Sequence, residues 1–125
     1  MKHLLPLLFN IFKVGPSTVT INGSSLMQVK RSGQLGTYFC FTDESFPPSE
    51  LNVVITDDKD NALEPIITRH PKMKATHGFA TMMEFSFKLE TYAEEIKIHC
   101  TASNGDSFLT TERTISIQSE NTSQK

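Results

Sequence analysis

Hydrophobic and polar residues alternate along most of the chain. In the segment 79–90 the odd positions are apolar apart from Thr81, and the even positions from Glu84 onward are polar. In the segment 95–102 the even positions are apolar and include Cys100, while the odd positions are polar. A period of two is that of a β-strand with one face in a core and one in water. Since no ten-residue stretch carries the i, i+3, i+4 apolar spacing of a helix, the pattern predicts an all-β chain.

Turn-forming residues divide this pattern into eight predicted strands. The turn signals include Asn22-Gly23, the Pro47-Pro48 pair, the acidic run 57–61 and Asn104-Gly105-Asp106, the last of which has the chemistry of a β-hairpin. The predicted strands are 18–21, 26–30, 36–42, 50–56, 63–68, 79–90, 95–102 and 108–117. Eight short strands separated by turns are typical of a two-sheet sandwich.

The third predicted strand is apolar on both faces. Tyr38 and Cys40 share one face, whereas Phe39 and Phe41 share the other. We expect the N-terminal apolar residues or a neighbouring loop to lie over Phe39 and Phe41; the alternative is that this face contacts a partner domain.

Chain length and charge narrow the class of protein. At 125 residues the chain can bury one hydrophobic core, and nine Phe residues argue against disorder. The net charge of −2 excludes the basic footprint of a nucleic-acid-binding protein.

The ends of the chain differ from its centre. Residues 1–14 contain an apolar run, Leu4 to Phe12, that is too short to span a bilayer, and we interpret the segment as a signal peptide or as an apolar N-terminal segment. Pro6, Asn10 and the lack of a small-x-small cleavage site argue against a signal peptide. Residues 15–118 form the predicted domain, residues 119–125 are a polar tail or linker, and no later segment is predicted to cross a membrane.

The only two cysteines are Cys40 and Cys100. Their separation fits neither a zinc or redox motif nor the dense disulfide framework of a mini-protein. From the spacing alone they form one long-range bridge or remain two thiols. A bridge would close a loop of about 60 residues, contribute on the order of 4 kcal/mol and require an oxidising compartment.

The sequence contains no pattern of catalytic or metal-binding residues. The four histidines lack i, i+2 or i, i+4 spacing, and the His70 and His77 pair is interpreted as a solvated feature of one loop. Read as a calcium loop, the acidic run would place Ala62 at a ligand position and Leu63 where glycine is needed. No nucleophile elbow, phosphate loop or zinc-protease motif occurs. We therefore predict no enzyme activity, no catalytic residue, no metal, no cofactor and no small-molecule substrate.

Three segments resemble immunoglobulin domains. The string Thr37-Tyr38-Phe39-Cys40-Phe41 resembles strand B, and Pro47-Pro48-Ser49-Glu50-Leu51-Asn52-Val53 resembles the approach from strand B to strand C in cell-adhesion domains. Residues 78–104 resemble strands E and F and end in Cys-x-Ala-x-Asn. The resemblance covers residues 15–118 and favours the C2-set domains of nephrin-like adhesion receptors. It implies an immunoglobulin-like β-sandwich of two antiparallel sheets with an inter-sheet disulfide between Cys40 and Cys100.

Two positions depart from that family. The strand C tryptophan that packs on the disulfide is replaced by a residue near Val53, and Ile98 stands where a tyrosine usually forms the tyrosine corner. Only Glu94 resembles the acidic residue that opens the usual string before the second cysteine. These departures affect the subtype more than the fold, and they predict that reducing the bridge unfolds the domain.

The resemblance implies a recognition module rather than an enzyme. We predict an extracellular domain, secreted or part of a plasma-membrane ectodomain, that binds another cell-surface or extracellular protein, with homophilic and heterophilic binding both open. The predicted contact residues lie on the sheet that would contain strands C and F: Asn52, Val54, Lys97, His99 and Thr101. The main alternative is a structural spacer within a longer ectodomain, and a secreted hydrolase or metal-dependent enzyme on a sandwich scaffold is a third. Two sequons predict glycosylation at Asn22 and Asn121.

Overall fold

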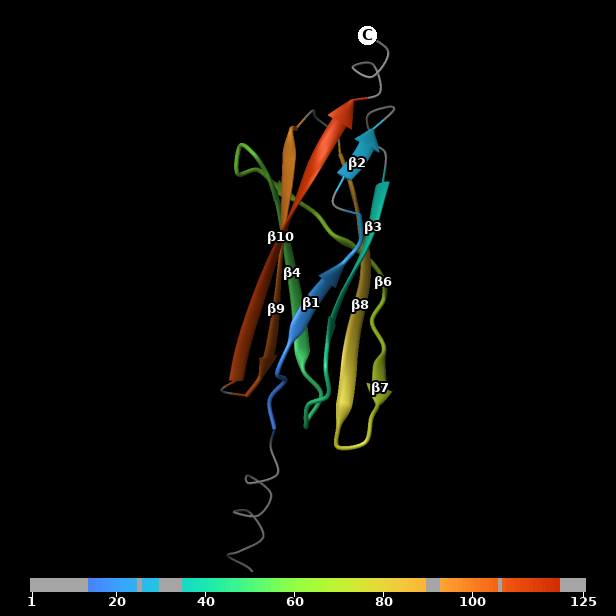
Figure 1. The fold of residues 1–125 in the computed structure, drawn as a ribbon, viewed down its shortest axis with the longest axis vertical. Helices are drawn as coiled ribbons and strands as arrows, with labels where there is room; N and C mark the ends of the chain where they lie inside the picture. The colour runs from blue at the N-terminus through green and yellow to red at the C-terminus, as the bar shows by residue number, and fades with distance from the viewer. Residues whose placement is uncertain (1–13, 25, 30–34, 90–92, 106, 120–125) are drawn as a thin grey trace, which may run out of the picture.

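The computed structural model describes residues 14–24, 26–29, 35–89, 93–105 and 107–119 (Figure 1). Within these ranges the protein consists of strands and turns, without a helix. The strands are β1 (Val19–Asn22), β2 (Leu26–Val29), β3 (Leu35–Thr42), β4 (Glu50–Asp57), β5 (Ala62–Leu63), β6 (Ile66–Arg69), β7 (Lys72–Lys74), β8 (Phe79–Lys88), β9 (Glu95–Asn104) and β10 (Ser107–Ser119).

The strands form two sheets that pack face to face (Figure 1). The first sheet has the order β1-β3-β8-β6, and β7 also pairs with β8. The second sheet has the order β2-β10-β9-β4-β5. Neighbouring strands are antiparallel, which confirms the predicted architecture, except that β2 runs parallel to β10. The alternating pattern of the sequence therefore produces a sandwich whose inner faces meet in one core.

The core takes the apolar positions that the alternation predicted. Its largest fully buried side chains come from both sheets: Tyr38, Phe85 and Phe87 from the first, and Ile55, Ile96, Ile98 and Ile115 from the second. Tyr38 stacks on Phe85 and Phe87, with ring centroids 6.3 and 5.8 Å apart. At about 25 cal/mol per Å² of apolar surface, burial of such side chains is the main force holding the sheets together.

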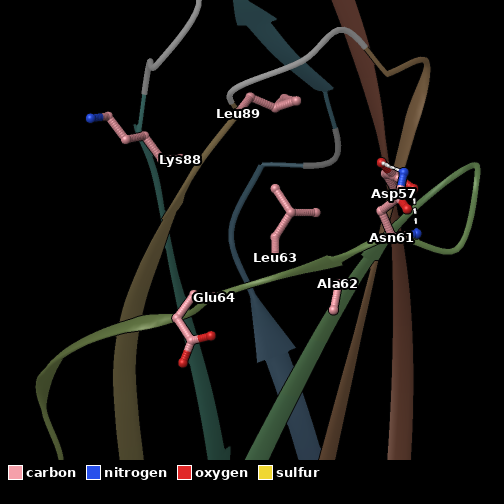
Figure 2. A pocket seen from close by; sticks show the side chains of 7 residues that line it. All are labelled: Asp57, Asn61, Ala62, Leu63, Glu64, Lys88 and Leu89. Atoms are coloured by element: carbon pink, nitrogen blue, oxygen red, sulfur yellow. Dashed lines mark hydrogen bonds between the residues drawn. The ribbon is translucent and has the colours of Figure 1, made fainter.

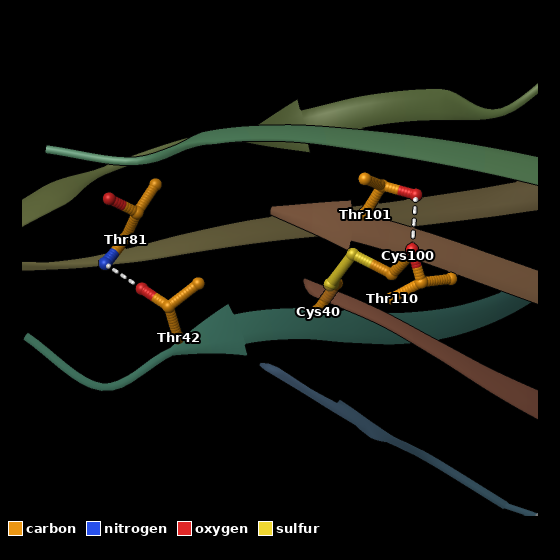
Figure 3. The surroundings of a disulfide bond; sticks show 6 residues. All are labelled: Cys40, Thr42, Thr81, Cys100, Thr101 and Thr110. Atoms are coloured by element: carbon orange, nitrogen blue, oxygen red, sulfur yellow. Dashed lines mark hydrogen bonds between the residues drawn. A yellow bond between two sulfur atoms is a disulfide. The ribbon is translucent and has the colours of Figure 1, made fainter. Parts of the chain in front are cut away.

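A disulfide joins the two sheets through this core (Figure 3). Cys40 on β3 and Cys100 on β9 are both fully buried, and their Cα atoms lie 6.5 Å apart. The bridge spans 60 residues of sequence. The prediction of an inter-sheet disulfide is thus confirmed.

The predicted strand 63–68 is wrong, because the chain changes sheets inside it. Residues 62–63 form β5, which pairs with β4 in the second sheet, whereas residues 66–69 form β6, which pairs with β8 in the first. Pro65 lies between them and has no N–H group to donate to a ladder. The short strand β7 was also missed, since it is only three residues long and its one apolar side chain, Met73, is exposed.

A second sheet change occurs between β1 and β2. Gly23 has φ 150°, and a Cβ atom there would clash with the ring of Tyr38. The Tyr38 hydroxyl donates a hydrogen bond of 2.7 Å to the carbonyl of Ser24. Arg113 donates to the carbonyls of Ile21 and Gly23 at 2.8 and 2.6 Å. The Asn22-Gly23 turn signal thus marks a crossover between sheets that is held by side chains far away in sequence.

Several predictions about the chain ends concern residues outside the described ranges. The apolar run 4–12, which was expected to cover Phe39 and Phe41, is among them, and so is the tail 120–125. Val14 is described, and it exchanges backbone hydrogen bonds of 2.8 Å with Phe46. In the part of the chain that the structure describes, no helix has the length and apolar character needed to cross a membrane.

Candidate protein-binding face

The five predicted contact residues lie together on the outer face of the second sheet. The strand register places Val54 opposite His99, and Asn52 opposite Thr101. Lys97 lies two positions before His99 on β9 and therefore points to the same side. Ile98 and Cys100, between them, are buried on the inner face. The alternation in β4 and β9 thus delivers all five side chains to one surface.

This outer face is open to solvent over β4 and only partly covered over β9. Asn52 and Lys97 are exposed, and Val54 keeps 45% of its surface accessible. His99 and Thr101 are half-buried because they lie between two neighbouring strands. An exposed valine in the middle of a mixed polar surface has the composition of a small apolar centre with a polar rim.

Strand β10 adds a charged group that sequence reasoning did not assign to this face. Glu112 lies opposite His99 in the register. Its Oε2 atom is 3.7 Å from Nε2 of His99 and 3.9 Å from Nζ of Lys97. All three side chains are substantially exposed, so these ion pairs contribute little to stability. The ion pairs nevertheless hold the side chains of Lys97, His99 and Glu112 together beside Val54.

Phe108 is a further residue of this face that was missed. It lies opposite Ser103 near the start of β10, and 70% of its surface is exposed. Thr110, two positions along, has its Oγ1 atom 3.4 Å from that of Thr101 (Figure 3). The sequence contained a signal for this face, namely alternation along the last strand. Leu109 and Ile115 occupy one face of that strand, and the other face carries Phe108, Thr110, Glu112 and Thr114. The register that sets these residues opposite those of β9 became known only from the structure.

A surface pocket lies at the β5 edge of the second sheet (Figure 2). It is lined by the turn after β4, by β5 and by the end of β8: Asp57, Asn61, Ala62, Leu63, Glu64, Lys88 and Leu89. The Asp57 carboxylate accepts hydrogen bonds from the backbone N–H groups of Lys59 and Asn61, at 2.9 and 2.8 Å, and from Nδ2 of Asn61 at 3.2 Å. Its oxygens are therefore engaged in closing the turn.

These hydrogen bonds affect the ionisation of Asp57. The backbone N–H of Asn61 is the largest influence that lowers the pKa of the Asp57 carboxyl below its ordinary range. Throughout the described ranges, no three His, Cys, Asp or Glu side chains are arranged to hold a metal ion. The acidic run 57–61 forms a turn that the Asp57 carboxylate stabilises.

The environment of the disulfide is also visible. Val53 lies opposite Cys100 in the β4–β9 register and is buried. It therefore lies next to the bridge, where the strand C tryptophan of immunoglobulin domains packs. Ile98 is fully buried in the core. Of the two sequons, Asn22 is exposed at the end of β1, and Asn121 lies beyond the described residues.

No protein-family model matches this sequence, and comparison with curated proteins gives no match. Solved structures superpose on it at low sequence identity. A chain from the crystal structure of Dpr2 Ig1-Ig2 in complex with DIP-Theta Ig1-Ig3 superposes with a TM-score of 0.50 and 17% identity, over 85% of this chain and 33% of that one. The IgNAR antibody domain C3 gives a TM-score of 0.48 and 18% identity, over 84% and 100%. Amylomaltase from Corynebacterium glutamicum gives 0.46 and 12%, over 94% and 15%.

The chain spans a third or less of the first and last of these structures. Together with the strand order and the bridge, the first comparison shows that the protein has an immunoglobulin-like β-sandwich fold.

Proposed function

We propose that this domain is an extracellular recognition module that binds another protein through the outer face of β4, β9 and β10. The observation that carries the proposal is the exposed Val54 lying next to the cluster of Lys97, His99 and Glu112. Interfaces commonly combine a small apolar centre with polar groups that fix orientation. Asn52, Thr101 and Phe108 extend the proposed surface along the strands.

The disulfide supports the proposed location. A bridge that crosses the core forms and persists in an oxidising environment, such as the secretory pathway or the cell exterior. The crystal structure that shares this fold was solved as a complex between two proteins with Ig domains, and such a protein is the partner class that we infer here. Membership of the C2-set and kinship with nephrin-like adhesion receptors are the finer form of the proposal.

Binding measurements with matched variants test the proposed face. The secreted chain is presented to itself and to a panel of immunoglobulin-domain ectodomains, and the affinity of any binding pair is measured by surface plasmon resonance. We expect Val54→Asp and His99→Asp each to weaken binding by about thirtyfold or more, the effect of losing a hot spot. Thr37→Asp is the control, because Thr37 is also an exposed strand residue but lies on the first sheet. Unchanged affinity in both face variants contradicts the assignment.

The placement of the strands also favours a second candidate, a spacer within a longer ectodomain. The described chain enters β1 from near one end of the long axis and β10 ends near the other, so that successive domains would follow head to tail (Figure 1). A spacer would remain monomeric and bind none of the panel proteins. A Val54-dependent complex would contradict the spacer.

A further inference from the structure

The outer face of the first sheet is the other large surface of the sandwich, and it has a different composition. Phe39 and Phe41 on β3 and Met82 on β8 lie on it, each half-buried. The register places Phe41 opposite Met82, and Phe39 opposite Glu84. Together these partly exposed side chains form an apolar platform on the sheet surface against which another group can pack.

The sequon asparagine lies beside these rings. Asn22 is opposite Phe39 in the β1–β3 register, and it is exposed. The preceding residue, Ile21, lies opposite Cys40 and is buried in the core, so the Asn22 side chain is on the outer face together with Phe39. Side chains that are directly opposite in an antiparallel pair have Cβ atoms about 5 Å apart.

We propose that Asn22 carries an N-linked glycan whose first sugar stacks on Phe39 and shields the aromatic outer face of the first sheet. In the modification, the Asn22 side-chain nitrogen forms a bond to the anomeric carbon of an oligosaccharide carried on a lipid diphosphate. The bond from that carbon to the diphosphate oxygen breaks, the lipid diphosphate leaves with the electron pair, and the amide loses one proton. The disulfide is consistent with passage through the compartment where this donor is used.

The geometry explains why Phe39 is the contact. A sugar attached to Asn22 can turn over β3, whose distance from β1 is about 4.8 Å. Pyranose C–H groups are polarised by the neighbouring oxygens, and they pack on the negative face of an aromatic ring. Beyond Phe39 in the same row lies Glu84, which pairs with Arg69 at 2.8 Å. This ion pair ends the row at β6 and offers polar groups to the next sugar.

The proposal gives the two outer faces different roles and is independent of the proposed binding face. A glycan over Phe39 excludes a protein partner from the first sheet, while the outer face of β4, β9 and β10 lies on the opposite side of the sandwich (Figure 1).

The test uses the full chain secreted from a eukaryotic host. Asn121→Gln removes the other sequon, and Asn22→Gln added to it removes both. We expect the intact mass of the Asn121→Gln chain to fall on enzymatic removal of N-glycans and that of the double variant to stay constant. A constant mass for the Asn121→Gln chain overturns the proposal.

Stacking is tested separately from attachment. In the glycosylated Asn121→Gln chain, protons of the first sugar should show upfield ring-current shifts in NMR spectra, and these should vanish in Phe39→Leu. Removing the glycan should lower the melting temperature by about 4 °C, and by much less in the Phe39→Leu background. Absent ring-current shifts, or equal losses of melting temperature in both backgrounds, overturn the stacking. The presence of ring-current shifts in the Asn121→Gln chain is itself a test that does not need the Phe39→Leu chain to be well folded.

Discussion

The two outer faces of the sandwich are built from the same alternating pattern, yet they present different chemistry. The outer face of the second sheet combines the exposed Val54 with ion pairs between strands. On the first sheet the outer face has more apolar side chains, but Phe39 and Phe41 are half-buried and lie beside a sequon. Apolar content alone therefore does not identify a binding face, because neighbouring side chains and a covalent sugar can occupy the same surface.

Removing the disulfide should affect both faces at once, because the bridge between Cys40 and Cys100 covalently links the two sheets. Loss of a bridge that closes a loop of about 60 residues should cost on the order of 4 kcal/mol. Urea unfolding of the reduced chain, followed by far-ultraviolet circular dichroism, should show the domain unfolded or close to its midpoint without denaturant. A reduced chain with the midpoint of the oxidised chain would contradict a structural role of the bridge.

Arg113→Met tests the point where the chain leaves the first sheet for the second. The substitution removes charge-assisted hydrogen bonds to the carbonyls of Ile21 and Gly23. We expect unfolding to become easier by about 2–3 kcal/mol. Thr114→Met, at the next and exposed position of β10, is the control and should change the free energy of unfolding by less than about 0.5 kcal/mol. Equal effects of the two variants would show that Arg113 does not hold the crossover.

Tyr38→Phe tests the same crossover from the core side. Loss of the hydroxyl bond to Ser24 should cost about 1 kcal/mol. Burial raises the pKa of Tyr38, although the charge of Arg113 opposes this. The folded-state pKa of Tyr38 therefore exceeds the unfolded one. The stability that the protonated hydroxyl contributes is complete below the unfolded pKa and is lost as the pH rises through the folded pKa.

Urea titrations between about pH 7 and 11 measure this pH dependence. Wild type should lose stability above about pH 10, the ordinary pKa of tyrosine. The Tyr38→Phe chain should lose less, so that the two curves converge. Parallel curves over this range would exclude a role for Tyr38 ionisation.

Phe41→Ser sharpens the contrast between the faces themselves. Since Phe41 is half-buried on an outer surface, its replacement should cost about 1 kcal/mol or less. If the second sheet carries the binding face, the affinity for a Val54-dependent partner should stay within twofold of wild type. A tenfold loss in a folded Phe41→Ser chain would move the binding site to the first sheet.

The smallest effect is expected at the turn beside the pocket. The lowered pKa of Asp57 means that its ionised form stabilises the folded state. That contribution is present above the unfolded pKa and is lost as the pH falls through the lower, folded pKa. Asp57→Asn should therefore be less stable than wild type at neutral pH, and the difference should shrink below about pH 4. Thermal melts across this range measure it, and a constant difference would show that ionisation of Asp57 is not its cause.

Most of the candidate site was accessible to sequence reasoning, because it depends on local alternation. Val54, His99 and Lys97 were placed on one surface from the facing of β4 and β9, and the register bears out that placement. Phe108 and Glu112 were missed, although the predicted hairpin at Asn104-Gly105-Asp106 already makes the last two strands neighbours. Alternation gives a strand two faces without giving the register that sets which residues lie opposite one another. The pairing of Phe108 and Glu112 with β9 depends on the hairpin at Asn104 and Gly105, where Gly105 has φ 61°.

The sequence by itself determined most of the strands, their inward positions and the facing of both cysteines, because a period of two is a property of consecutive residues. Only the tertiary structure decided that residues 62–69 divide between two sheets, that β2 pairs in parallel with β10, and that Asn22 lies beside Phe39. The physical reason is that sheet membership and register depend on hydrogen bonds between residues far apart in the chain. Residues such as Arg113, which bonds to carbonyls 90 or more positions away, have no local signature of that role.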